Sequence, residues 1–231
     1  MNRLLISGTN SGCGKTTVTC ALLSALQARG ITPTVFKSGP DYIDPMFHRA
    51  VTGVNAYNLD PFFLNGEGLR SHLTSYASSL SVIEGAMGYY DGIATTVKSS
   101  AYTVAKETKT PVILVVSAKG VGHSISALLE GFKQHREDSQ IEGVIFNHAN
   151  KSRYSDLKKM AEEAGIQMYG TFPHDEKWAL PSRHLGLFTA GEIKDLQKTM
   201  QLLGQQAEET IDIDGLLEIA KTASVLENEQ P

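Results

Sequence analysis

The segment from Leu4 to Thr17, LLISGTNSGCGKTT, constrains this 231-residue chain more than any other stretch. A short apolar run stops at a glycine-rich loop, and a lysine and two threonines then open a long helical pattern. This order of strand, loop and helix start suits a phosphate site, because backbone N–H groups at such a turn converge on an anion. We predict that Lys15 places its charge near the terminal phosphates of ATP and that the Thr16 hydroxyl binds Mg²⁺. The predicted nucleotide-binding residues are Asn10, Ser11, Gly12, Cys13, Gly14, Lys15, Thr16 and Thr17.

The loop is one residue longer than a standard P-loop, because Gly8 and Gly14 enclose five residues instead of four. In this respect it resembles the loop of dethiobiotin synthetase and its relatives. A glycine-rich turn between a strand and a helix can be no more than a tight turn. The preceding strand, the GKTT sequence and the following helix together favour a nucleotide site.

The rest of the chain alternates apolar strand patterns with amphipathic helix patterns, which predicts one α/β domain with a mostly parallel sheet and a P-loop NTPase-like three-layer α/β/α fold. We expect a proline-containing connection over 57–62, one or two amphipathic helices after Ile193, a domain spanning 1–225 and a polar tail over 226–231. The expected strands are 4–6, 34–37, 80–83, 111–117, 141–147 and 167–172, and the expected helices are 15–29, 47–52, 66–76, 99–108, 124–135 and 152–164.

Composition and charge exclude several classes of protein. The net charge of −4 and the lack of a basic stripe argue against nucleic-acid binding. No segment approaches the roughly 18 consecutive apolar residues of a membrane span, and no signal peptide is evident, so we expect a cytoplasmic protein with small-molecule partners. Cys13 and Cys20 are too few for a disulfide scaffold, and a small loop residue is a better interpretation of Cys13 than a redox-sensitive thiol. The seven histidines lack zinc-site spacing and are expected mostly at the surface or in loops.

Charged side chains gather where predicted strands end. Lys37 ends one strand and is followed by GPDYIDP, residues 39–45, in which two prolines and a glycine predict a turn carrying Asp41 and Asp44. Those aspartates could instead stabilise turns or cap a short helix starting near Pro45. Glu84 ends another strand and can reach Mg²⁺ directly or through water, and Asp91 lies seven residues further on.

Longer motifs carry a family resemblance. The chain contains, in order, KSGPDYIDP, NLDPF, EGAMGYYDG, VILVVSAKGVGHSISALLEGF, GVIFNHA and LPSRHLGL. Together they resemble the ATP-dependent synthetase domain of cobyrinic acid a,c-diamide synthases, which are relatives of dethiobiotin synthetase. The resemblance implies amidation of two acetate side chains of a corrin precursor, with ATP, Mg²⁺ and ammonia or glutamine.

The resemblance also implies roles for individual residues in forming an acyl phosphate that ammonia attacks. Lys15 and Lys37 would neutralise charge on the transferred phosphoryl group. The carboxylates at Asp41, Asp44, Glu84 and Asp91 would complete the catalytic set. Our assignment places Thr16, Asp41 and Glu84 near Mg²⁺, and Asp44 and Asp91 on the substrate side.

Three further residues each have two interpretations. Asn147 resembles the base-recognising asparagine of dethiobiotin synthetase, and a turn or helix cap is an equally good interpretation. Arg183 and His184, within LPSRHLGL, adjoin a proline turn and suit either a buried hydrogen-bonding role or ligand contact.

Members of the family usually continue into a glutaminase domain, and neither cysteine here lies in a nucleophile elbow, so we assign no glutaminase activity to this chain. Three sources of ammonia stay open: a glutaminase domain of a longer protein, a glutaminase on another chain, and free ammonia used by a stand-alone enzyme. A homodimer is plausible because related synthetases build sites across a subunit interface. Three alternatives stay open: a dethiobiotin synthetase-type ligase, a nickel-tetrapyrrole a,c-diamide synthase, and a partitioning-type switch ATPase. The switch ATPases usually carry an extra lysine early in the loop, where this chain has Thr9, Asn10 and Ser11.

Overall fold

The computed structural model describes residues 1–178 and 196–226. Its centre is a seven-stranded sheet in the order β3-β2-β4-β1-β5-β6-β7, and every neighbouring pair is parallel. The strands are β1 (Asn2–Gly8), β2 (Thr34–Ser38), β3 (Ala56–Leu59), β4 (Leu80–Glu84), β5 (Val112–Ser117), β6 (Ile141–Asn147) and β7 (Gln167–Phe172). The predicted α/β class with a parallel sheet is therefore confirmed.

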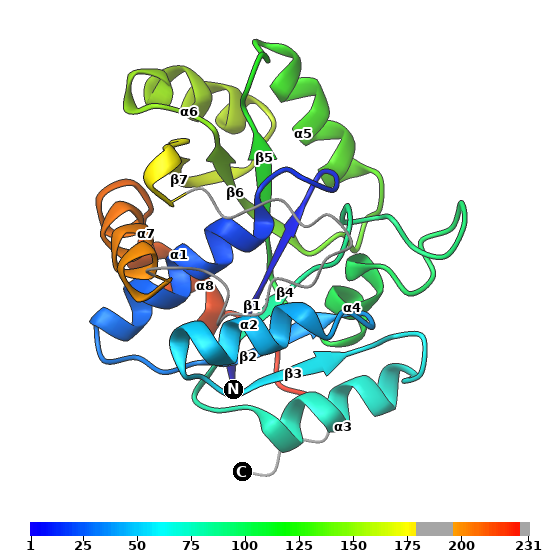
Figure 1. The fold of residues 1–231 in the computed structure, drawn as a ribbon. Coiled ribbons are helices and arrows are strands. Elements are labelled where there is room, and N and C mark those ends of the chain that lie inside the picture. Colours follow the sequence, from blue (N-terminus) through cyan, green and yellow to red (C-terminus); the bar gives the residue numbers. More distant parts are fainter. Residues whose placement is uncertain (179–195, 227–231) are drawn as a thin grey trace.

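Helices cover both faces of this sheet (Figure 1). One face packs against α1 (Lys15–Ala28), α2 (Ile43–Thr52), α7 (Leu196–Thr210) and α8 (Ile213–Lys221), and the other against α3 (Gly66–Tyr76), α4 (Ala101–Glu107), α5 (Ser124–Gln134) and α6 (Tyr154–Glu163). Short 3₁₀ helices lie at Lys151–Arg153 and Glu176–Trp178. No helix in the described ranges is long and apolar enough to cross a membrane.

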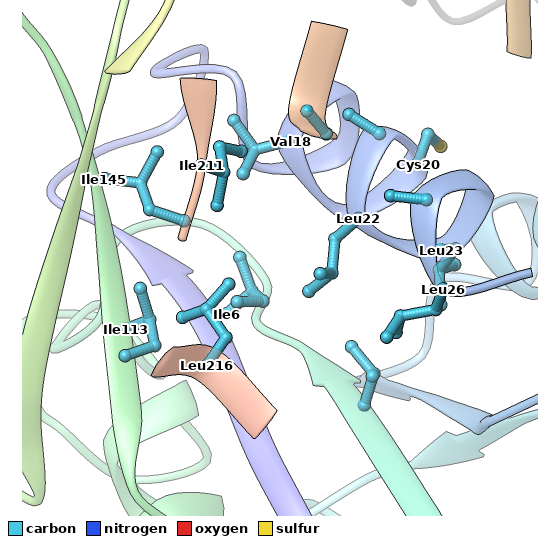
Figure 2. Close-up of a cluster of buried hydrophobic side chains, with 14 of the residues drawn as sticks. Ile6, Val18, Cys20, Leu22, Leu23, Leu26, Ile113, Ile145, Ile211 and Leu216 are labelled. Carbon is cyan, nitrogen blue, oxygen red and sulfur yellow. The ribbon is translucent and has the colours of Figure 1, made fainter. Parts of the chain in front are cut away.

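Alternation along the strands divides the core into two clusters. Leu4 and Ile6 of β1 point toward α1, whereas Leu5 points toward the opposite helices. Figure 2 shows the first cluster, in which Ile6 and Ile113 of the sheet face Leu22 of α1. Because both faces are covered, the strands are apolar on both sides, which explains uninterrupted runs such as VILVV in β5.

Helices α7 and α8 follow Ile193, in agreement with the prediction, and they complete the first face of the sheet. Gly204 of α7 lies so near α1 that an added Cβ would stand 2.9 Å from the Ser24 Cβ, so a side chain at 204 would push the helices apart. Leu226, which we had assigned to the polar tail, is buried in the second cluster. The packed domain therefore includes Leu226.

The structure corrects the prediction between Lys37 and Pro61 in two places. Residues 56–59 form β3, an edge strand paired with β2, where we expected only a connection. This strand has four residues, too few to show the alternation of apolar and polar residues by which a strand is predicted. Helix α2 begins at Ile43 and contains Pro45, within the stretch expected to be irregular. Proline is tolerated there because N–H groups in the first helical turn need no helical partner.

Candidate functional site

The P-loop connects β1 to α1 at the carboxyl edge of the sheet, where ligands bind in open α/β folds (Figure 1). Gly12 and Gly14 have φ values of 79° and 96°, a left-handed backbone that favours glycine. Asn10, Ser11 and Gly12 are exposed, so their backbone groups are accessible to a ligand. The loop and the α1 N-terminus thus have the form of a phosphate site.

Lys15 begins α1 and its side chain is buried beneath this loop. Its Nζ donates a 3.1 Å hydrogen bond to the Asn10 carbonyl. Burial lowers the pKa of Lys15 below its usual value, and the positive charge of Lys37 lowers it further. The Cys13 side chain is also buried, and an added Cβ at Gly8 would lie 2.2 Å from its sulfur. The Cys13 backbone, and not its thiol, therefore faces a ligand, which agrees with the interpretation of Cys13 as a small loop residue.

Glu84, at the end of β4, is fully buried and collects contacts from three elements. Its Oε1 accepts hydrogen bonds from the Thr16 hydroxyl at 2.7 Å and from Lys37 Nζ at 3.0 Å. Lys37 also pairs with Asp44 Oδ2 at 2.6 Å and donates to the Gly85 carbonyl at 3.3 Å. The predicted residues Thr16, Lys37, Asp44 and Glu84 therefore form one connected charged cluster.

Burial alone would disfavour the ionised form of Glu84. The charge of Lys37 and hydrogen bonds from His48 and Thr16 outweigh this, so the pKa of Glu84 lies below its usual range. The carboxylate is therefore ionised at neutral pH and can only accept hydrogen bonds or bind a cation.

His48 is the residue that our sequence interpretation missed, because we expected the histidines mostly at the surface. It lies on α2, fully buried, with Nε2 2.7 Å from Glu84 Oε2. Its other nitrogen, Nδ1, lies 3.8 Å from the Cys20 sulfur. The available signal was the spacing of Asp44 and His48, four residues apart and hence on one helical face, provided that the helix begins before Pro45.

The two aspartates of GPDYIDP have different surroundings. Asp41 Oδ1 accepts from the backbone N–H groups of Ile43 at 2.9 Å and Asp44 at 3.4 Å, and so caps the start of α2. Asp44 is buried and contacts Lys37. Our assignment had placed Asp41 at the metal and Asp44 on the substrate side, whereas the geometry brings Asp44 to the Lys37–Glu84 cluster.

The loop after β4 lies directly against the P-loop. Tyr89 N–H donates to the Gly8 carbonyl at 2.8 Å, and an added Cβ at Gly88 would lie 2.9 Å from the Thr9 oxygen. Asp91 is exposed and its Oδ2 accepts from Gly88 N–H at 2.9 Å. The loop therefore brings Asp91 to the rim of the site, where its charge raises the pKa of Lys15 against the effect of burial.

Asn147 ends β6 and lies beneath the P-loop. Its amide nitrogen donates to the Cys13 carbonyl at 2.9 Å, and an added Cβ at Gly14 would stand 1.9 Å from that nitrogen. Asn147 thus supports the loop from below, a contact the sequence had not indicated. LPSRHLGL, with Arg183 and His184, lies outside the described residues.

The side chains present fit a magnesium ion. In the described part of the chain no group of three or more His, Cys, Asp or Glu side chains could hold a metal ion. Mg²⁺ needs fewer, since it commonly keeps water ligands and binds through one or two protein oxygens and the phosphates. The Thr16 hydroxyl and the Glu84 carboxylate supply such a pair.

Comparison with curated proteins finds similarity to a,c-diamide synthases. The chain is 40% identical over 232 residues to cobyrinate a,c-diamide synthase of Listeria monocytogenes, covering 98% of this chain and 51% of the relative. It is 42% identical over 220 residues to hydrogenobyrinate a,c-diamide synthase of Brucella anthropi, covering 94% and 50%. The chain therefore spans about half the length of the curated relatives it matches.

Solved structures resemble this chain in fold alone. The MinD cell division protein of Aquifex aeolicus matches with a TM-score of 0.52 and 12% identity, covering 96% of this chain and 95% of that one. The 54 kDa signal recognition particle protein of Aeropyrum pernix matches with a TM-score of 0.55 and 17% identity, covering 95% and 49%.

Residues 4–188 match the CbiA model, described as the CobQ/CobB/MinD/ParA nucleotide binding domain. Since this match covers most of the chain, the protein belongs to the CobQ/CobB/MinD/ParA nucleotide-binding domain family.

Proposed function

We propose that this chain catalyses ATP-dependent amidation of the a and c acetate carboxylates of cobyrinic acid or a close corrin precursor. Ammonia would come from glutamine through a glutaminase domain or chain. The identity of about two residues in five to cobyrinate and hydrogenobyrinate a,c-diamide synthases supports the substrate class. Those relatives are about twice as long as the aligned region, which supports a glutaminase on a further domain or chain as the source of ammonia.

The observation that carries the proposal is the cluster of Lys37, Glu84 and Thr16 beside the P-loop. Glu84 is within 3.0 Å of both Lys37 Nζ and the Thr16 hydroxyl. A lysine at the end of the second strand adds a positive charge to that of Lys15, which suits transfer of a phosphoryl group to a second anion.

The reaction needs transfer of a phosphoryl group because a carboxylate is a poor acyl donor. Its oxygen attacks the γ-phosphorus of ATP, the bond to the β-phosphate oxygen breaks, and an acyl phosphate and ADP result. Ammonia then attacks the acyl carbon, phosphate leaves, and the nitrogen loses a proton to give the amide. A bound Mg²⁺ would supply charge neutralisation on the phosphates.

Each residue then has a definable task. Lys15 and the loop N–H groups bind the phosphates, and Lys37 stabilises negative charge near the transferred group. Thr16 and Glu84 would hold the metal. We revise the aspartates by their surroundings: Asp44 orients Lys37, whereas the more accessible Asp41 and Asp91 face the incoming carboxylate or ammonia.

A turnover assay tests the proposal. Purified protein, MgATP and ammonium would be mixed with cobyrinic or hydrogenobyrinic acid, ADP release followed enzymatically, and the product weighed by mass spectrometry. We expect successive mass losses of about one unit per acid converted to amide, dependent on ATP and lost in Lys15→Ala.

Two results would contradict it. ADP release with no change in either corrinoid would reject the substrate class while leaving the ATP site intact. No ADP release with any tetrapyrrole acid, even after a glutaminase chain and glutamine are added, would reject the ligase activity.

A further inference from the structure

His48 is buried and contacts Glu84, yet phosphoryl transfer as described does not use it. The two oxygens of Glu84 are divided between partners on different elements. Thr16 of α1 and Lys37 of β2 contact Oε1, whereas His48 of α2 contacts Oε2 at 2.7 Å. Because its two oxygens have different partners, the carboxylate is held against rotation about the Cγ–Cδ bond.

The direction of the hydrogen bond follows from the surroundings of Glu84, whose Oε1 already accepts from the Lys37 ammonium and the Thr16 hydroxyl. An ionised carboxylate only accepts, so His48 Nε2 must carry the hydrogen. Nδ1 then faces the Cys20 sulfur at 3.8 Å, a contact that connects the ring to α1. His48 is thereby held from α1 on one side and holds Glu84 on the other.

We propose that His48 is a positioning residue for the metal–nucleotide site, which keeps Oε2 occupied so that Oε1 faces Thr16, where Mg²⁺ would bind. The proposal rests on the MgATP part of the proposed function. A neighbour that orients a metal ligand without touching the metal commonly affects metal affinity strongly.

The placement of His48 supports more than a packing role. An imidazole at 0% exposure is costly unless its nitrogens are paired, and an apolar side chain could fill the same space. Asp44, one helical turn earlier, pairs with Lys37 at 2.6 Å. Helix α2 therefore holds both charged neighbours of the site, Lys37 through Asp44 and Glu84 through His48.

The test measures ATP affinity by calorimetry with Mg²⁺ and with EDTA, so it needs no corrinoid. In His48→Gln the amide nitrogen can reach the position of Nε2, whereas in His48→Asn it is too short. We expect His48→Asn to reduce the Mg²⁺-dependent gain in ATP affinity by roughly tenfold or more, with affinity in EDTA nearly unchanged. His48→Gln should restore most of the gain. His72→Asn, on α3 against Tyr76, is the matched control and should behave as wild type.

Several outcomes would overturn the proposal. A purely structural role would lower affinity equally with Mg²⁺ and with EDTA, and Asn and Gln would then behave alike. Unchanged magnesium dependence in both variants would show that Glu84 needs no such restraint. If wild type itself binds ATP without regard to Mg²⁺, the metal part of the proposed function fails, and the role of His48 fails with it.

A second comparison covers the case in which His48→Asn does not fold. If His48 acts through Glu84, His48→Leu should lower the Mg²⁺-dependent gain in ATP affinity of the wild type, and the combined variant His48→Leu and Glu84→Gln should show the same magnesium dependence as Glu84→Gln alone. A further loss in the double variant would assign His48 a separate action and overturn the proposal.

Discussion

The Thr16 hydroxyl donates a 2.7 Å hydrogen bond to Glu84 Oε1, although the two residues are 68 positions apart in the sequence. This bond joins the start of α1 to the end of β4, so the phosphate-binding loop and the carboxylate of the neighbouring strand form one site. An incoming cation would be offered a hydroxyl oxygen and a carboxylate oxygen already side by side.

Removing the hydroxyl of Thr16 should therefore weaken magnesium-dependent binding selectively. We expect Thr16→Ala to raise the Mg²⁺ concentration for half-maximal ATP binding by roughly tenfold or more, because one of two protein oxygens is lost. Thr16→Ser keeps the hydroxyl and is the control. Titration of Mg²⁺ at fixed ATP measures the effect, and equal behaviour of Ala and Ser would argue against a metal at this position.

Lys15→Ala should greatly reduce ATP hydrolysis with little loss of stability. Burial lowers the pKa of Lys15, so its charged form is disfavoured where it lies, and the Asn10 carbonyl that loses its hydrogen bond belongs to an exposed residue. The loss of charge at the phosphates should reduce ATP hydrolysis by about 10²–10³-fold. Steady-state ADP release checks this, with Lys158→Ala on the exposed face of α6 as the control. Hydrolysis near the wild-type rate would place the phosphates elsewhere.

Lys37→Met should instead destabilise the fold. Its removal leaves Asp44 and Glu84, both buried, without the cation that contacts each within 3.0 Å. Breaking a buried ion pair from one side typically costs about 3–5 kcal/mol of unfolding free energy. Urea denaturation measures this, and Lys106→Met, which removes an exposed partner of Asp138, should change the midpoint little. A small effect at Lys37 would mean that water enters the cluster and compensates.

Asn147→Ala separates loop support from base recognition. The change removes the hydrogen bond to the Cys13 carbonyl, so nucleotide affinity should fall by about two- to tenfold. If Asn147 also recognises the base, ATP affinity should fall more than GTP affinity. Competition binding with both nucleotides decides between the roles, since an equal loss for ATP and GTP leaves loop support alone.

Tyr90 gives a prediction for alkaline pH. Burial, followed by the charge of Tyr102, raises the pKa of Tyr90 to about 12 from a usual value of 10.0. Because the folded pKa is the higher one, Tyr90 contributes stability that is present below pH 10.0 and is lost as pH rises toward about 12. Absorbance titration at alkaline pH should show that Tyr90→Phe removes a late-ionising phenol. Loss of an early-ionising one would contradict the packing of Tyr90 against Phe132 and His135.

The sequence determined the fold class and the outline of the site because both depend on local patterns. Lys37 and Glu84 end strands that pair directly in the sheet, so parallel geometry brings them together without further information. The burial of His48 could not be predicted from the sequence, because it depends on Glu84, 36 positions away, and on a helix that begins before a proline. The revision that we propose for the roles of Asp41 and Asp44 has the same origin, since the start of α2 decides which carboxylate is buried against Lys37.

Strand β1, which carries the P-loop, pairs with β4 and β5, so the nucleotide site forms only when these later strands are in place. Asn2 pairs with Leu80 and Leu5 with Val112, so the strand that carries the P-loop is completed only by partners from much later in the chain. Contacts of such sequence separation close slowly and late in folding. During synthesis the glycine-rich loop would therefore leave the ribosome long before it can hold a nucleotide. ATP present in the cell would favour only the finished fold, which makes the ligand a selective stabiliser of fully assembled molecules over nascent ones.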